Sequence, residues 1–319
     1  MKLVLLGATG AIGESIAAEL RRRGQSYRAV GRDRASLNRV FGSDSLAEIA
    51  VWNPDDPASV KAALRDTDAA VYLVGVPYNH FELHPVLMRQ TLDAAIAEGV
   101  QQMLLVGTVY PYGRTQATPA REDHPREPHT FKGRMRKQQE DLLLEADAAG
   151  QIRGTVLRLP DFYGPRVKNS FVDSVFTAAA TGGTANLIAP IDRPHQFVYV
   201  PDVGATVLDL LQHPEAHGRW WHLAGDDTPS IQQIVAMVGE MARKPVKTRV
   251  FGTTMLRLIG LFQPVMRELV EMNYLLTDPF IMDDSALRSL LGGLKKTPLR
   301  EGLRQSLEAA RSHHRSQSA

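Results

Sequence analysis

The chain has 319 residues, of which 44% are hydrophobic and 23% charged, so it can form one large α/β domain or a main domain with a smaller companion. Its 37 Lys and Arg residues nearly balance 35 Asp and Glu residues, and the formal net charge of +2 argues against a nucleic-acid partner. The sequence contains no cysteine, which excludes disulfides, thiolate zinc sites and a cysteine nucleophile.

Short apolar runs alternate with longer segments of helical period through the first half of the chain. The expected strands are Lys2–Leu6, Tyr27–Val30, Glu48–Trp52, Ala69–Val74, Met103–Val106 and Thr155–Leu159. The expected helices are Ala11–Arg23, Ala35–Phe41, Pro57–Leu64, His84–Glu98 and Lys132–Ala149. Gly24, Gly99 and Gly150 follow three of these helices, where a left-handed residue is commonly needed. The alternation predicts an α/β fold of Rossmann type with a doubly wound parallel sheet.

After Leu159 the alternation ends, and Pro and Gly residues interrupt the chain every few positions. We expect a smaller C-terminal substrate lobe that covers the carboxyl edge of the sheet. Its expected helices are Ile231–Ala242, Thr254–Leu261, Val265–Leu275, Asp284–Leu290 and Leu299–Arg311. The expected domain bounds are 1–160 for the dinucleotide-binding domain, with 195–212 returning to it, 161–311 mainly for the lobe, and 312–319 for a flexible tail.

A glycine-rich turn joins the first strand to the first helix. It reads Gly7-Ala8-Thr9-Gly10-Ala11-Ile12-Gly13 and leads directly into strong helix formers. Glycines at this place let the chain turn sharply and let its backbone approach a diphosphate, which the N–H groups of the following helix attract. The turn therefore predicts a dinucleotide site that includes Gly7, Thr9, Gly10, Ala11, Ile12 and Gly13.

The Gly-x-x-Gly-x-x-Gly spacing resembles the short-chain dehydrogenase/reductase superfamily, in the version of its extended and atypical branches, which include epimerases and dehydratases acting on sugar nucleotides. The segment Leu157-Arg158-Leu159-Pro160-Asp161-Phe162-Tyr163-Gly164-Pro165 is similar to the Arg-x-x-x-x-x-Tyr-Gly-Pro segment of the extended branch, and Phe197–Val203 to its later strand. The resemblance implies that further cofactor contacts are made by Asn53 near Asp56, by Val74, Gly75 and Val76, and by Tyr163.

The second strand ends in Val30-Gly31-Arg32-Asp33-Arg34, which bears on the choice of cofactor. An acid there commonly binds the ribose hydroxyl of NAD, whereas a cation suits the 2′-phosphate of NADP. Arg32 comes first and favours NADP, while Asp33 leaves NAD as the alternative.

Relatives of this kind that transfer hydride carry a Ser or Thr after the fifth strand and then Tyr-x-x-x-Lys on the next helix. Thr108 falls at the Ser/Thr position, where it would polarise the substrate oxygen. The next helix has no tyrosine, and Lys132 and Arg136 stand at the Tyr and Lys positions. Like charge from Arg136 would disfavour the ammonium form of Lys132, which makes a lysine acid/base possible. Binding of an anion or of the cofactor ribose, and a solvated basic helix face, are the alternatives.

Other candidate proton donors are the phenols that follow the strands. Tyr110, Tyr112 and Tyr163 are expected near the carboxyl ends of the strands, where active sites of such sheets gather. Tyr78, His80 and His84 follow the fourth strand and are expected near the same cleft. No helix is expected before Pro85, and the histidines do not form a metal site.

The sequence thus predicts an NAD(P)-dependent oxidoreductase or an epimerase/dehydratase-like enzyme acting on a small carbonyl or sugar-nucleotide-like substrate. The alternative is a regulatory protein that binds NADP and has lost catalysis, because the Tyr–Lys pair is absent. The chain has no apolar run of roughly 20 residues. We therefore expect a cytoplasmic protein with no nucleic-acid or membrane partner, in which a homodimer is a further possibility.

Overall fold

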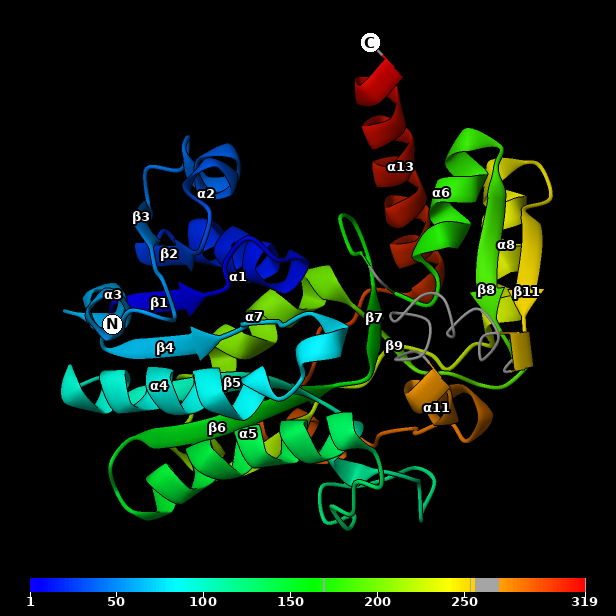
Figure 1. Cartoon of the computed structure of the whole chain (residues 1–319). Coiled ribbons are helices and arrows are strands. Elements are labelled where there is room, and N and C mark those ends of the chain that lie inside the picture. Colours follow the sequence, from blue (N-terminus) through cyan, green and yellow to red (C-terminus); the bar gives the residue numbers. More distant parts are fainter. Residues whose placement is uncertain (169, 253, 256–269, 319) are drawn as a thin grey trace.

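The computed structural model describes residues 1–168, 170–252, 254–255 and 270–318 of the chain (Figure 1). A main domain built on one large sheet occupies one side of the molecule, and a smaller lobe stands beside it. Most of the helix predicted at Thr254–Leu261 lies outside the described residues, as do residues 265–269 of the helix predicted at Val265–Leu275. The described remainder of that second prediction, residues 270–275, is largely helical and ends in α11 (Tyr274–Thr277).

The large sheet has seven parallel strands in the order β10-β6-β5-β4-β1-β2-β3. Their bounds are β1 (Leu3–Leu6), β2 (Tyr27–Gly31), β3 (Ala47–Val51), β4 (Ala69–Tyr72), β5 (Gln102–Thr108), β6 (Arg153–Leu159) and β10 (Arg219–His222). The first six correspond to the predicted strands, and the doubly wound Rossmann-type fold is confirmed. The sequence analysis did not predict β10, because its short run begins with Arg219 and ends with His222 and has no apolar pattern.

Helices cover both faces of the sheet because neighbouring strand residues point to opposite sides. In β1, Leu3 and Leu5 face α1 (Ala11–Arg22), α2 (Arg34–Phe41) and α7 (Val200–Leu210). Val4 and Leu6 face α3 (Pro57–Leu64), α4 (Leu83–Ala97) and α5 (Phe131–Ala148) on the other side. All four side chains are at most 1% exposed, and each contributes about 1.5–3 kcal/mol through burial. Because all seven strands are parallel, their carboxyl ends lie at one edge of the sheet.

The five predicted helices of the main domain begin and end within one residue of their expected bounds. They are α1 (Ala11–Arg22), α2 (Arg34–Phe41), α3 (Pro57–Leu64), α4 (Leu83–Ala97) and α5 (Phe131–Ala148). Gly24, Gly99 and Gly150 have φ values of +65°, +76° and +68°, which confirms their left-handed role. The segment Phe197–Val203 was expected to be a strand, but only Phe197–Tyr199 is one, and α7 (Val200–Leu210) follows and packs on α1.

The smaller lobe holds two short parallel strand pairs and the later helices. The strands are β7 (Asp161–Tyr163) with β9 (Phe197–Tyr199), and β8 (Thr184–Ile188) with β11 (Lys247–Phe251). The helices are α6 (Asp173–Thr181), α8 (Ile231–Ala242), α11 (Tyr274–Thr277) and α13 (Leu299–Ser318), whereas α12 (Ser285–Leu290) packs through Leu287 against the core of the main domain. Short 3-10 turns are η1 (Tyr78–His80), η2 (Tyr110–Tyr112) and η3 (Pro214–Ala216). Helix α13 runs through most of the segment expected to be a flexible tail.

A buried ion pair fixes α5 against β6. The Arg158 guanidinium, which is fully buried, donates to both carboxylate oxygens of Glu140, and Arg126 donates to the same carboxylate at 3.0 Å. The Arg158 guanidinium also lies 4.3 Å from the ring centroid of Tyr112 and 4.6 Å from that of Trp220. The arginine of the Arg-x-x-x-x-x-Tyr-Gly-Pro segment therefore has a structural role.

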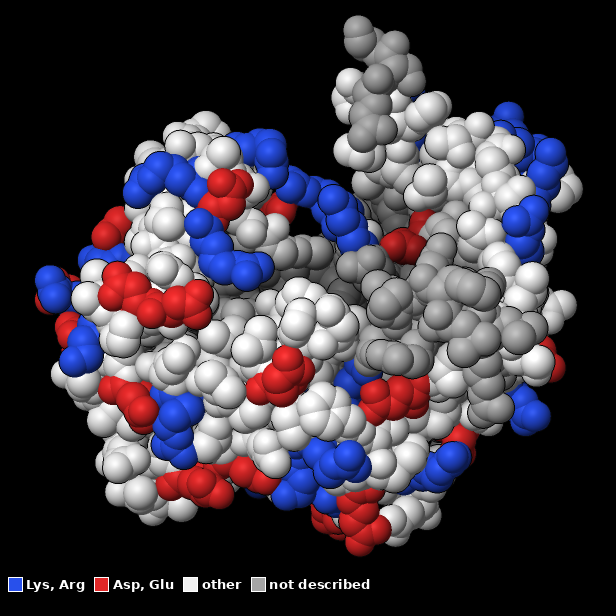
Figure 2. Space-filling view, in the orientation of Figure 1, with Lys and Arg blue, Asp and Glu red and all other residues white. Residues whose placement is uncertain are grey.

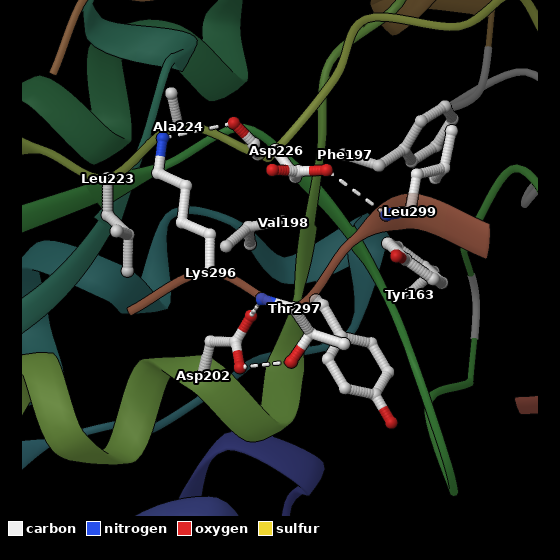
Figure 3. A pocket seen from close by; sticks show the side chains of 12 residues that line it. Tyr163, Phe197, Val198, Asp202, Leu223, Ala224, Asp226, Lys296, Thr297 and Leu299 are labelled. Atoms are coloured by element: carbon white, nitrogen blue, oxygen red, sulfur yellow. Dashed lines mark hydrogen bonds between the residues drawn. The ribbon is translucent and has the colours of Figure 1, made fainter. Parts of the chain in front are cut away.

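A small cavity lies where the segment before α13 crosses the main domain (Figure 3). Its polar groups bind one another: Asp202 accepts from the Thr297 N–H and hydroxyl at 2.7 Å each, and Asp226 accepts from the Leu299 N–H at 3.1 Å. Lys296 donates to the Gly225 carbonyl at 3.1 Å. These bonds attach the segment before α13 to the main domain. We therefore assign the polar groups around the cavity a structural role and do not interpret the cavity as a binding site.

Candidate active site

The glycine turn has the shape that a diphosphate cradle requires. Gly7 has φ +88°, and a Cβ there would lie 2.9 Å from the Leu73 carbonyl oxygen. A Cβ at Gly13 would lie 2.3 Å from the Ala8 carbonyl oxygen, so only glycine lets α1 approach the turn this closely. Helix α1 starts after the exposed Gly10, which supplies no side-chain cap. Its first N–H groups therefore remain available to an anion.

This turn lies at the place where the strand order reverses, between β1 and β4, which is where doubly wound sheets bind their ligands. Val74, Gly75 and Val76 follow β4 directly. Gly75 is exposed, and a Cβ there would have no contact within 4 Å outside the neighbouring residues. The residues at the switch point thus fit a dinucleotide along the edge of the sheet.

The side chains after β2 and β3 differ in whether they already form hydrogen bonds within the protein. The Asp33 carboxylate caps α2 by accepting from the Ser36 N–H at 2.8 Å. Hydrogen bonds from the Ser36 side chain and then from its N–H lower the pKa of Asp33. Arg32 is exposed and forms no hydrogen bond or ion pair with the part of the chain that the structure describes. The amide oxygen of Asn53 accepts from the Asp55 N–H at 3.1 Å within its own turn. Arg32 is therefore the more available of these side chains for a ligand.

Lys132 is buried beneath a group of aromatic side chains. Its side chain is 0% exposed, and its Nζ lies 5.7 Å from the ring centroid of Tyr78 and 5.6 Å from that of Phe81. The Nζ donates to Glu271 Oε2 at 2.6 Å, while the Lys132 N–H donates to Glu271 Oε1 at 3.0 Å. The interpretation of Lys132 as part of a solvated helix face is therefore wrong.

Glu271 was not among the predicted site residues. Burial raises its pKa, but the opposing effect of the bonds from Lys132 is larger in sum, and the pKa of Glu271 is lowered. An ionised Glu271 balances the charge of Lys132, which the sequence analysis placed only beside another cation. Glu271 lies 139 residues after Lys132 in the chain, outside any motif that contains Lys132. No signal in the sequence therefore identifies it as the partner of Lys132.

Arg136 is also buried, with 7% exposure, and it faces the interior of the main domain. Its guanidinium lies 3.3 Å from His84 Nδ1 and donates to the Val106 carbonyl at 3.2 Å. His84 stands inside α4, so the expectation that no helix precedes Pro85 is wrong. His80 lies on the surface, where it pairs with Glu82 at 3.1 Å.

Two of the predicted phenols meet above Lys132. The Tyr78 and Tyr110 hydroxyls lie 2.9 Å apart, and the Tyr110 N–H donates to Thr108 Oγ1, at the end of β5, at 3.3 Å. Burial raises the pKa of both phenols, and that of Tyr110 is raised further by the neighbouring Tyr78 and Asp161. Thr108, Tyr110 and Lys132 are thus brought together, with Tyr78 added. We call these four residues the polar cluster.

Tyr112 and Tyr163 lie elsewhere. Tyr112 is 0% exposed, stacks on Phe280 with centroids 4.8 Å apart, and its hydroxyl bonds with His222. Tyr163 is 2% exposed and packs against Tyr199 in the core of the lobe. Neither phenol reaches the polar cluster, because both rings are enclosed by packing.

Asp161 and His195 are hydrogen-bonded to each other at the start of β7, a contact that the sequence analysis missed. The Asp161 carboxylate is 23% exposed, and it adds to the effect of burial in raising the pKa values of Tyr78 and Tyr110. The pair adds a carboxylate to the lobe side of the site.

Buried histidines predict how stability changes with pH. Burial, followed by Arg136, lowers the pKa of His84 to about 2, and burial, followed by Arg158, lowers that of His222 to about 3. Both are neutral in the folded protein, whereas they take up protons in the unfolded chain below a pKa of about 6.5. The unfolded state then binds more protons, so the free energy of unfolding falls as the pH drops from about 6.5.

Each of these histidines contributes a slope of about 1.4 kcal/mol per pH unit. Urea unfolding between pH 7 and pH 4.5 measures the slope, and the double variant His84→Gln/His222→Gln is expected to flatten it. An unchanged slope in that variant would contradict the assignment.

The described residues contain no group of three or more His, Asp or Glu side chains placed to hold a metal ion. Among the same residues, no helix combines the length and apolar character needed to cross a bilayer.

The glycine turn at the switch point of a doubly wound sheet defines a dinucleotide-binding protein. The model of the NAD dependent epimerase/dehydratase family matches residues 3–224, and the chain belongs to this family. It is therefore an NAD(P)-dependent enzyme of the oxidoreductase and epimerase kind.

Curated relatives and solved structures agree with this placement. The chain is 25% identical over 229 residues to a probable dTDP-4,6-dihydroxy-2-methyloxan-3-one 4-ketoreductase from Streptomyces antibioticus, covering 68% of this chain and 70% of that protein. It is 27% identical over 222 residues to a dTDP-6-deoxy-L-talose 4-dehydrogenase (NAD(P)(+)) from Kitasatospora kifunensis, covering 65% and 69%. The fold matches UDP-glucuronic acid 4-epimerase from Bacillus cereus in complex with NAD, with a TM-score of 0.82, 17% identity and coverage of 98% and 100%.

Proposed function

We propose that this protein is an NADP-dependent ketoreductase that acts on a ketone of a nucleotide-linked deoxysugar. The observation that supports it most is the polar cluster, in which hydroxyl donors and an ammonium group gather at the carboxyl end of β5, beside the switch point. The two curated relatives support the substrate class, since both are named for reactions at position 4 of dTDP-linked sugars.

The cluster suits proton donation better than proton removal. A bound nicotinamide would supply the hydride. Thr108 would hold the ketone oxygen, and Tyr110 or Lys132 would give the proton that completes the alcohol. Tyr78 and Tyr110 keep their protons at neutral pH because burial raises their pKa values. An alkoxide formed on reduction is a stronger base than a phenolate and takes such a proton readily.

Epimerisation or dehydration through a ketone begins instead with the oxidation of an alcohol. That step needs a base at the substrate hydroxyl. We favour reduction because the first of the two curated relatives is named as a 4-ketoreductase. In this proposal Tyr112 and Tyr163 serve packing, and Arg136 links α5 to His84 on α4 and to the Val106 carbonyl of β5.

The test is the consumption of NADPH with a dTDP-linked 4-keto-6-deoxyhexose. We expect NADPH fluorescence to fall and a dTDP-6-deoxyhexose to form, with a much slower reverse reaction at neutral pH. Tight NADPH binding without turnover on any ketone of a broad panel would contradict the proposal and favour the regulatory alternative.

Arg32 is proposed to bind the 2′-phosphate of NADP, since Asp33 is occupied as a helix cap. Arg32→Ala is expected to raise the Kd for NADPH by about tenfold or more, because a charge-assisted hydrogen bond is lost, and to leave the Kd for NADH nearly unchanged. Fluorescence titration measures both constants. Arg39→Ala, on the helix α2 that follows Arg32 and bonded to Ser36, is the matched control. Equal weakening of both cofactors would overturn this assignment.

The remaining features are proposed on less direct grounds. Residues 161–311 would select the substrate, and Asn53, Val74 and Val76 would line the cofactor. A cytoplasmic location and a homodimer through α4 and α5 complete the proposal. These two helices pack together, and Val86 on α4 and Phe131 on α5 leave 48% and 42% of their surfaces exposed.

A further inference from the structure

An ion pair links the loop after β7 to the first turn of α1. Arg166 Nη1 lies 2.9 Å from Glu14 Oε2, with side-chain exposures of 60% and 20%. Arg166 follows Tyr163, the last residue of β7, by three positions, so it belongs to the loop that leaves β7. Figure 2 shows Lys and Arg side chains that run from the α2 end of the main domain towards the hollow beside the lobe.

The pair lies over the N-terminal end of α1. Side chains on a helix incline towards its N-terminus, so a residue covers the turn before its own Cα. Glu14 stands four residues after Gly10, the exposed residue that precedes α1. The Arg166 guanidinium is thus held close to the N–H groups that are expected to receive the diphosphate.

The backbone of Arg166 gives independent support. Its φ of +63° lies in the left-handed region, which is costly for a residue other than glycine. Asp66 and Arg243 share this feature in the described chain, but they directly follow α3 and α8, where left-handed residues are ordinary. Arg166 follows no helix. Strained residues of this kind gather at ligand clamps, where the surrounding structure holds them.

We propose that Arg166 binds the diphosphate of the dinucleotide, and that its guanidinium exchanges the Glu14 carboxylate for the diphosphate when the dinucleotide binds. In the free protein the Glu14 carboxylate holds the guanidinium at the mouth of the cradle. When the dinucleotide binds, the guanidinium donates instead to an oxygen of the diphosphate, with the planar fork that suits phosphate recognition. Glu14 thereby competes with the cofactor for Arg166, since both are anions.

The competition gives the two residues opposite effects on cofactor affinity. Arg166→Ala is expected to raise the Kd for both NADPH and NADH by about tenfold, because a charge-assisted bond is lost. Glu14→Gln is expected to lower both Kd values, because Arg166 is released and a like charge is removed. The double variant is expected to resemble Arg166→Ala, and Arg166→Lys to keep part of the affinity. Fluorescence titration and calorimetry provide these constants without turnover.

Lys168→Ala removes an exposed cation two residues further on and serves as the matched control, with an unchanged Kd expected. Adenosine 2′-monophosphate, which has no diphosphate, is expected to bind Arg166→Ala and the unaltered protein equally. Weaker binding in Glu14→Gln, or unchanged binding in Arg166→Ala, would overturn the proposal. An unaltered protein that binds neither dinucleotide would instead contradict the cofactor assignment itself, so the two failures are distinguishable.

Discussion

Replacing Lys132 with methionine is expected to lower kcat by at least about a hundredfold, the loss typical of removing a group that transfers or steers a proton. Methionine keeps the length of the side chain in a fully buried position but removes the ammonium that bonds Glu271. The Kd for NADPH is expected to change little, because the cradle of the glycine turn is untouched. Separate measurement of kcat and of the Kd for NADPH distinguishes a catalytic role of Lys132 from a role in cofactor binding.

Two other variants sharpen this test. Glu271→Gln keeps one of the two acceptors of Lys132 but removes the charge that balances its ammonium group, so a smaller fall in kcat is expected. Lys137→Met, on the same helix but 35% exposed and paired with Asp141, is the matched control and should leave kcat unchanged. If Lys132→Met keeps its kcat within a few fold, Lys132 has only a structural role.

Glu140→Gln is expected to lower the free energy of unfolding by about 3–5 kcal/mol. The carboxylate is 1% exposed and is the counterion of the fully buried Arg158 guanidinium. Glutamine keeps the shape but leaves Arg158 buried without a negative charge, and it presents an amide group to the donors of Arg126. Removing one partner of such a pair costs more than the pair itself contributes, because the remaining charge stays out of water.

Urea unfolding at neutral pH measures this loss. Asp141→Asn is the control, since Asp141 is 28% exposed and pairs with Arg126 and Lys137 near the surface. A change of at most about 1 kcal/mol is expected for it. Equal losses for the two variants would show that burial does not govern the strength of these ion pairs.

The main domain was largely predictable because its signals are local. Helix α3 begins at Pro57, the residue after its cap Asp56, and α8 begins after the capping residue Ser230, and both helices have the bounds that the sequence predicted. Strand β10 has no such signal, since it pairs with β6 across a long separation in the chain. Its place in the sheet results from tertiary packing and not from its own composition.

The active site was predictable only where motifs fix it. The glycine turn and Thr108 follow directly from strands, so their places were expected. Glu271 and the pair of Asp161 with His195 come together through folding of distant segments, and an isolated acid or histidine in a sequence does not show its partner. The enclosure of Tyr112 could not be foreseen either, because it depends on Phe280 and His222.

The chain passes back and forth between the main domain and the lobe, which limits how the protein can be divided into fragments. Strand β10 covers the outer edge of β6, and α7 covers part of α1, although both come after the first lobe segments. A fragment that stops at residue 160 would expose an unpaired strand edge and an uncovered apolar helix face, both of which promote aggregation. Neither part is therefore a severable module, and proteases that nick surface loops should leave the pieces associated.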